Sequence, residues 1–539
     1  MRSIRKMASA ALAAAALAVP VAGAVFTAPA VDAAEDQEIQ RGGTLNVILN
    51  PEPAILILAL NQQTPIQTVG GKIYEGLLRY DFDLNPMPGL AEDWEVSEDG
   101  LTYTFHLHEG VTWHDGEPFT SEDVVFSVTE MLPEVHPRAR SNFSHVEEVT
   151  APDDHTVVFT LKQPFPAFIL AFEVSSAPIM PKHIYEGGDY RNNEMNDTPI
   201  GTGPFQFDEW QKGSHIRLAR NDDYYLEGKP YLDEIYFRII PDAASRALAL
   251  ETGDADISQY GDVEPFDVQR LEALSHLRLD TRGYEFVAPL SWIEINHREE
   301  PLGDKRFRQA IMYALDREFI RDNIWFGLGR VATGPVASVT THYEPDVKKY
   351  PHDPEKAREL LDEMGLTPDD DGVRAEVEFM VMPYGEVWSR LAEYIKQAMG
   401  QVGVEVTLRA TDAGGWADRL SNWNYEMTND YVYQYGHPAL GVARTYVSSN
   451  IRKGVLFTNT MGYENERVDE LFEQAAVEND PDKRQEMYSE VQQILVEDVP
   501  IVWLLEMEFP NLINERVHNA ITTAIGTTEN FADVWVESP

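Results

Sequence analysis

The sequence predicts an α/β protein with at least two lobes. Its 539 residues are 43% hydrophobic, which is enough to bury more than one core. In the first half, segments such as 101–113 alternate apolar and polar residues, a pattern typical of half-buried strands. In the second half, expected strands and helices alternate along the chain. This change of pattern predicts a β-rich lobe followed by an α/β lobe.

The strands are expected from apolar alternation. In 101–113, Tyr103, Phe105 and Leu107 face one side, and threonine and histidine face the other. The other expected strands cover 43–50, 155–165, 232–240, 375–382 and 404–410, with two more within 205–221.

The helices are expected from caps and from apolar residues on one face. Asp353 and Pro354 begin a helix that stops at Gly365, and Asp480 followed by Pro481 repeats this start. The helix over 303–324 places Phe307, Ile311, Ala314 and Leu315 on one face, and the helix over 244–257 ends at Gly253; further helices are expected over 387–403 and 479–500.

The N-terminal residues are typical of a secretory signal peptide. Three basic residues precede an apolar run over 7–25, and small residues allow cleavage after Ala33. The chain contains no cysteine, which excludes disulfides, thiolate ligands and a lipid anchor attached through cysteine. We therefore expect a soluble, exported protein in the Gram-negative periplasm, with free secretion as the alternative.

The charge of the chain limits its partners. The formal net charge is −47, which repels nucleic acids and anionic membrane surfaces. We therefore expect neither as a partner. The acidity is typical of adaptation to a salty medium, where screening weakens self-repulsion.

Residues 113–124, WHDGEPFTSEDV, have the composition of an active site but favour a structural interpretation. Asp115 and Gly116 are typical of a hairpin turn, and Pro118 ends strand pairing because it lacks an N–H. Thr120 and Asp123 have the spacing of a capping box at the start of a helix.

The sequence shows no pattern of catalytic, metal-binding or cofactor-binding residues. There is no HExxH, GxSxG, P-loop or dinucleotide glycine motif. His106 and His108 share a strand face but have no third ligand beside them. We expect no cofactor, no metal and no enzymatic activity. A hydrolase with a pair of carboxylates stays open, because the chain contains 90 acidic residues.

Four blocks, in order, resemble one known family across nearly the whole chain. They are LAEDWEVSEDGLTYTFHLHEGVTWHDGEPFTSEDVVFS at 90–127, the glycine-rich start and strand region of 201–257, INHREEPLGDKRFRQAIMYALDREFI at 295–320, and YPHDPEKARELLDEMG at 350–365. They are similar to the extracellular solute-binding proteins of ABC transporters, family 5, the dipeptide, oligopeptide and nickel group. One departure is His108, where the family usually has lysine or arginine.

The resemblance implies a two-lobed periplasmic binding protein of type II, of the large cluster with an extra subdomain, and a hinge between the lobes. Lobe I is expected at 34–50, 200–288 and 508–539, with the inserted subdomain at 51–199. Lobe II is expected at 289–507. The implied function is capture of a peptide or another polar solute by lobe closure. The implied partner is the ABC permease in the inner membrane, and we expect a monomer.

The segment 431–463 is the expected ligand-binding loop. Its 33 residues lack Asp and Glu although 90 of the 539 residues are acidic. The resemblance places its start in the cleft, where peptide-binding relatives carry an aspartate for the amino terminus of the ligand. Without that acid, a neutral or anionic solute is favoured, such as a sugar, an opine-like conjugate or an N-blocked peptide. Asp430 or Asp412 is the alternative counter-charge. The candidate residues in this loop are Tyr433, Gln434, Tyr435 and His437.

Other candidate ligand-binding residues lie outside this loop. Arg390 is similar in position to a carboxylate-binding residue of dipeptide-binding relatives, although pairing with Glu386 or Glu393 is equally compatible with the sequence. Trp416 and Trp292 are candidates for stacking, with the core as the alternative. Asn61 and Gln62 follow the first strand in a polar loop. Uptake of a metal complex, as in the nickel branch, rests on His437 alone.

Overall fold

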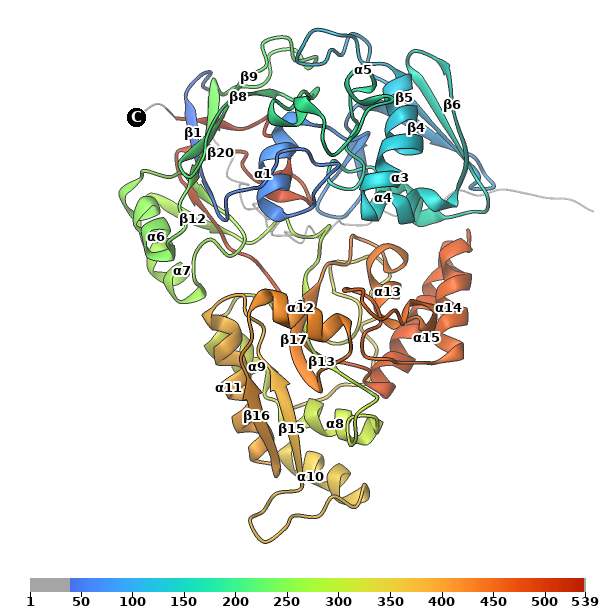
Figure 1. Ribbon diagram of the computed structural model, residues 1–539, viewed down its shortest axis with the longest axis vertical. Helices are drawn as coiled ribbons and strands as arrows, with labels where there is room; N and C mark the ends of the chain where they lie inside the picture. Colours follow the sequence, from blue (N-terminus) through green and yellow to red (C-terminus); the bar gives the residue numbers. More distant parts are fainter. Residues whose placement is uncertain (1–38, 538–539) are drawn as a thin grey trace, which may run out of the picture. The chain divides into compact units, whose positions relative to one another are not determined.

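The computed structural model describes residues 39–537, and the expected signal peptide at 1–33 lies outside them. Two large sheets organise this part of the chain (Figure 1). The seven strands of the first sheet run in the order β12-β19-β11-β1-β10-β9-β8. They are β1 (Thr44–Leu49), β8 (Phe205–Gln211), β9 (His215–Arg220), β10 (Glu234–Ile239), β11 (Ile257–Ser258), β12 (Leu277–Asp280) and β19 (Asn511–Asn514).

The second sheet has six strands in the order β14-β18-β13-β17-β15-β16. They are β13 (Leu290–Ile295), β14 (Arg330–Val331), β15 (Ala375–Met380), β16 (Val404–Arg409), β17 (Met427–Val432) and β18 (Val502–Glu506). β15 pairs in parallel with β16 and β17, whereas β13 pairs antiparallel with β17 and β18. The chain passes between the two sheets twice, through 281–289 and through 507–510.

A smaller four-stranded sheet lies within the first half of the sequence. Its order is β4-β5-β7-β6, formed by β4 (Ala91–Val96), β5 (Thr102–Leu107), β6 (Val146–Asp153) and β7 (Thr156–Leu161). Every second residue of β5 is buried, which confirms the alternation seen in the sequence. Short two-stranded ladders join β2 (Leu78–Tyr80) to β3 (Pro86–Pro88) and β20 (Val517–His518) to β21 (Trp535–Val536).

The helices cover these sheets and begin at residues with a clear capping role. Asp353 accepts a hydrogen bond from the backbone N–H of Lys356 at 3.0 Å, and Asp480 caps the longest helix in the same way. The main helices are α1 (Thr64–Ile73), α2 (Ser121–Phe126), α4 (Pro137–Asn142), α6 (Ala243–Thr252), α7 (Pro265–Glu272), α8 (Lys305–Ala314), α10 (Pro354–Glu363), α11 (Glu386–Gly400), α12 (Ala413–Ser421), α14 (Glu466–Val477) and α15 (Pro481–Asp498).

The expectation of one helix over 303–324 was wrong. Helix α8 ends at Ala314, and Asp316 then accepts a hydrogen bond from the backbone N–H of Phe319 at 2.9 Å. This new cap starts the short helix α9 (Arg317–Phe319), which continues into a π-helical turn, η5 (Ile320–Ile324). Aspartate competes for backbone N–H groups, so it begins a helix more readily than it continues one.

The stretch 113–124 forms the expected turn and capping box, but Pro118 does not end the pairing, because the backbone N–H of Phe119 still donates to the carbonyl oxygen of Val111 at 3.0 Å. Gly116 has φ +89°, and Thr112 pairs with Pro118 across the turn. Both hydrogen bonds of the capping box between Thr120 and Asp123 are present at the start of α2. His114 adds a contact that the pattern did not indicate, because its Nε2 lies 2.9 Å from the carbonyl oxygen of Gly203.

Buried apolar side chains form two separate clusters. One packs around the first sheet and the four-stranded sheet, and the other packs mainly around the second sheet and its helices. Within residues 39–537, no helix has both the length and the apolar character needed to span a bilayer. The lobe and subdomain boundaries given above stay predictions.

Candidate functional site

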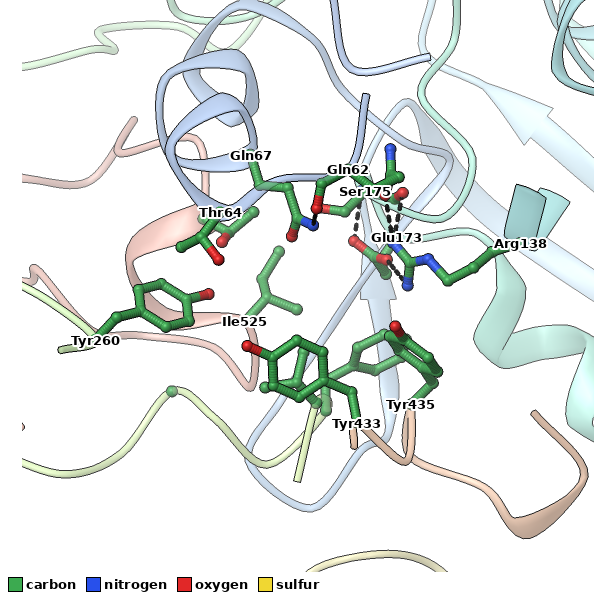
Figure 2. Close-up of a pocket in the computed structure, with 14 residues that line it drawn as sticks. Gln62, Thr64, Gln67, Arg138, Glu173, Ser175, Tyr260, Tyr433, Tyr435 and Ile525 are labelled. Atoms are coloured by element: carbon green, nitrogen blue, oxygen red, sulfur yellow. Dashed lines mark hydrogen bonds and ion pairs between the residues drawn. The ribbon is translucent and has the colours of Figure 1, made fainter. Parts of the chain in front are cut away.

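A cavity lies where the first and second halves of the chain meet, and Figure 2 shows the side chains that surround it. Its volume is about 60 Å³, which is room for about four water molecules. Its wall combines residues of α1, α4, the 281–289 connection, the segment after β17 and the C-terminal region: Gln62, Thr64, Gln67, Arg138, Glu173, Ser175, Tyr260, Gly283, Phe286, Val287, Tyr433, Tyr435, Ile525 and Thr528.

Arg138, in helix α4, supplies the positive charge of the cavity. Its guanidinium donates hydrogen bonds to the side-chain oxygen of Gln62 at 2.8 Å and to the carbonyl oxygen of Ser175 at 2.6 Å. A further bond reaches the hydroxyl of Ser176 at 3.0 Å. Only 16% of the arginine side chain is exposed, so these bonds fix the direction of a largely desolvated charge.

Glu173 is the counter-ion of Arg138 and is almost completely buried. One carboxylate oxygen lies 3.6 Å from the guanidinium and accepts the hydroxyl of Ser176 at 2.5 Å. The other oxygen accepts the backbone N–H of Ser175 at 2.5 Å. The carboxylate is thus held by three groups of the protein, while the hydroxyl of Ser175 has no hydrogen-bond partner among residues 39–537.

Aromatic rings form the side of the cavity opposite α1. The guanidinium of Arg138 lies over the Tyr435 ring, 4.4 Å from its centre, and that of Arg444 lies 5.5 Å from the same centre. The ring of Tyr433 is 6.2 Å from Tyr435, and that of Phe286 is 6.3 Å away. Tyr435 has φ +50°, a left-handed conformation that is unusual for an aromatic residue and turns its ring toward Arg138.

The tyrosine hydroxyls remain protonated hydrogen-bonding groups. Burial raises the pKa of Tyr260 to about 12 and raises that of Tyr433 well above its ordinary value. Together with the hydroxyls of Thr64 and Thr528, they make one end of the cavity neutral and polar. The other end carries the Arg138–Glu173 pair (Figure 2).

The structure brings three of the sequence-predicted residues to this cavity: Gln62, Tyr433 and Tyr435. Gln434, between the two tyrosines, instead points into the protein. Its side-chain oxygen accepts from the N–H of Ala337 at 2.9 Å and from the Thr340 hydroxyl at 3.0 Å. Its side-chain nitrogen donates to a backbone carbonyl at 2.9 Å.

His437 is also turned away from the cavity lining. It is buried, and its Nδ1 accepts the backbone N–H of Ala439 at 3.1 Å, which caps the π-helical turn η6 (Pro438–Val442). Its ring packs 5.0 Å from that of His342. Burial lowers the pKa of His437 well below its ordinary value, so the ring is neutral.

The remaining predicted residues lie elsewhere. Arg390 pairs with Glu386 at 2.8 Å and its guanidinium lies 5.6 Å from the centre of the Phe266 ring, in a separate small hollow. Trp416 and Trp292 are buried and donate to Thr428 at 2.9 Å and to Glu294 at 2.8 Å. Asn61 caps a turn by accepting the N–H of Gln63 at 2.9 Å. A direct contact between any predicted residue and a solute stays a prediction.

Sequence reasoning missed Arg138, Glu173 and Tyr260. Arg138 follows a proline in a short helix, and Glu173 follows an apolar run, so neither has a local pattern typical of a binding residue. The two side chains meet only through the packing of α4 against the loop at 172–176.

Comparison with known proteins identifies the family. The family model described as "Bacterial extracellular solute-binding proteins, family 5 Middle" matches residues 85–454. The chain therefore belongs to this family of extracellular solute-binding proteins, which confirms the resemblance. The oligopeptide-binding protein AppA of Bacillus subtilis is 29% identical over 494 residues, covering 88% of this chain and 87% of AppA.

Solved structures have the same fold. The ABC transporter substrate-binding protein CtaP of Listeria monocytogenes superposes with a TM-score of 0.82 at 28% identity, covering 93% of this chain and 100% of CtaP. AppA of B. subtilis, in complex with a nonapeptide, gives 0.77 at 26% identity, covering 93% and 100%. AgaA of A. tumefaciens R10, in complex with agropinic acid, gives 0.75 at 26% identity, covering 92% and 99%. The expected two-lobed α/β fold of periplasmic binding proteins is confirmed.

Proposed function

We propose that this protein is the periplasmic receptor of an ABC importer, that it binds a peptide or a peptide-like polar solute in the described cavity, and that it delivers the solute unchanged to the permease. The single observation that carries this proposal is the composition of the cavity wall. Residues from both halves of the chain line the cavity, so a solute bound there contacts both halves at once.

Lobe movement follows from the size of the cavity. A volume of about 60 Å³ is well below the roughly 300 Å³ at which pockets for small solutes begin. A peptide therefore enters only when the two sides separate, and it is enclosed when they return. A contact outside the cavity lining also joins the two halves of the chain: Asn479, between α14 and α15, donates to the carbonyl oxygen of Asp99, in the turn after β4, at 2.8 Å.

An opine or a sugar is the second candidate solute. The neutral hydroxyl end of the cavity suits either one, and the structural relative AgaA was solved with agropinic acid. A hydrolase is less well supported, because glycoside hydrolysis uses two carboxyl groups across the substrate. Of the residues between 39 and 537 that line the cavity, Glu173 alone is acidic, and Arg138 neutralises it.

The test is recovery of the natural solute. Protein purified under mild conditions is denatured, and the released small molecules are identified by mass spectrometry. The proposal predicts a peptide-like or opine-like compound in about equimolar amount, which raises the melting temperature of solute-free protein and is recovered intact after incubation. Chemical conversion of the compound by the protein would contradict the receptor role.

A further inference from the structure

The charges around the cavity select among solutes, and this inference rests on the proposed function. Glu173 is the acidic residue of the lining, and its charge is already engaged by the protein. Its oxygens accept hydrogen bonds from Ser175 and Ser176, and one of them lies 3.6 Å from the Arg138 guanidinium. An ammonium group of a solute would therefore compete with Arg138 for this carboxylate.

Other acids close in sequence to the lining are also engaged. Asp412, an exposed residue, caps α12 by accepting a backbone N–H at 2.7 Å, and Glu285 accepts another at 2.8 Å. Asp430 is buried and accepts a backbone N–H at 2.7 Å. Burial raises its pKa well above the ordinary range, which disfavours the charged carboxylate. None of these three lines the cavity, so no counter-charge for an amine comes from them.

Arg444 adds a second positive charge beside Tyr435, although it is not itself part of the lining. Arg138 and Arg444 both lie over the Tyr435 ring, and Arg444 donates to two backbone carbonyl oxygens at 3.1 Å. One donor of Arg138 is bonded to the neutral side-chain oxygen of Gln62, a half-buried residue at the edge of the cavity. A carboxylate that replaces this amide forms a stronger, charge-assisted bond in the same position.

We propose that the cavity selects a solute that carries a carboxylate and has no free amino group close to it, and that Arg138 binds this carboxylate. An N-blocked peptide and an opine-type conjugate both have this chemistry. The free amino terminus of an ordinary peptide, in contrast, meets in the lining one carboxylate, Glu173, whose charge Arg138 already offsets.

Three tripeptide probes separate the two charges. N-acetyl-trialanine retains the carboxylate without the amine, trialanine amide retains the amine without the carboxylate, and trialanine carries both. Isothermal titration at pH 7, where the amine is mostly protonated, measures each dissociation constant. We expect N-acetyl-trialanine to bind at least tenfold more tightly than trialanine amide, and more tightly than trialanine.

Two variants assign the effect to one side chain. Arg138→Gln removes the charge and is expected to weaken binding of N-acetyl-trialanine at least tenfold. Arg140→Gln is the matched control on the same helix, because Arg140 is exposed and donates only to the carbonyl oxygens of Pro133 and Glu134. The melting temperature of each variant shows whether it is folded, and Arg138→Lys retains the charge if the glutamine variant does not fold.

The possible outcomes are distinct. Trialanine amide binding as tightly as N-acetyl-trialanine, or trialanine binding more tightly than either, overturns the selection and leaves the receptor function intact. Unchanged affinity for N-acetyl-trialanine in a folded Arg138→Gln variant overturns the role of Arg138. If only Arg138→Lys folds, loss of its preference for N-acetyl-trialanine over trialanine amide overturns the role of the positive charge at this position. Absence of binding by all three probes removes the peptide part of the proposed function, and this inference with it.

Discussion

The position of Gln434 between two cavity tyrosines leads to a prediction about stability. Gln434 is 1% exposed and bonds to three groups of the segment 335–340. Gln434→Ala leaves the buried N–H of Ala337 and the buried carbonyl of Pro335 without partners. Each such group costs about 1–3 kcal/mol, whereas the Thr340 hydroxyl can rotate to another acceptor. We therefore expect a loss of about 2–6 kcal/mol in the free energy of unfolding.

Urea denaturation followed by tryptophan fluorescence measures this loss, and titration with N-acetyl-trialanine measures binding by the folded variant. The matched control is Gln401→Ala, at an exposed glutamine after α11, which should change the unfolding free energy by less than about 0.5 kcal/mol. If Gln434→Ala unfolds like the unaltered protein but binds the probe much more weakly, the reasoning is refuted and Gln434 is a ligand-contacting residue.

Three further predictions concern the packing of Gly441, the pH dependence of stability, and the hydrogen bond between Asn479 and Asp99. Gly441→Ala should lower the unfolding free energy in urea by about 1–3 kcal/mol, because its Cβ would lie 2.2 Å from a backbone carbonyl oxygen; Gly414→Ala, where the nearest atom is 3.7 Å away, should not destabilise the protein. Burial raises the pKa of Glu75 to about 7, so its contribution to stability is present below pH 4.5 and is lost as the pH rises to 7. Glu75→Gln should therefore reduce the pH dependence of the free energy of unfolding, measured with urea, by about 3 kcal/mol across this window, and an unchanged pH dependence would contradict the assignment. Asn479→Ala removes the bond to Asp99 and should weaken binding of N-acetyl-trialanine about two- to fivefold by calorimetry, whereas equal affinity would show that this contact does not stabilise the closed form.

Local patterns in the sequence predict much of the fold. Alternation in 101–113 gives β5, and aspartate followed by proline marks the starts of α10 and α15. The capping box at Thr120 is present because its two hydrogen bonds depend on residues only three positions apart. The break at Asp316 was missed because an apolar face continues across it, and apolar periodicity alone does not reveal a new cap.

The site is less predictable because it depends on contacts between distant segments. Tyr433 and Tyr435 were found because a stretch without acidic residues is unusual in so acidic a chain. Arg138 and Glu173 were missed because their pairing depends on tertiary packing over 35 positions of sequence. For Trp416 the sequence suggested a ligand-stacking role that the structure does not support. The side chain is buried, and its indole N–H donates a hydrogen bond to Thr428.

We propose that the two lobes close when the solute binds, and a distance measured between them tests this closure directly. The chain has no cysteine, so Glu98→Cys, beside Asp99, and Glu473→Cys, in α14, give two unique spin-label positions at exposed residues. Electron paramagnetic resonance then measures the distance distribution before and after the small-molecule fraction released from the native protein is added back. If the solute closes the lobes, the distance distribution becomes shorter and narrower when the solute is added. Arg138→Gln should then reduce this change. An identical distribution with and without saturating solute would contradict closure.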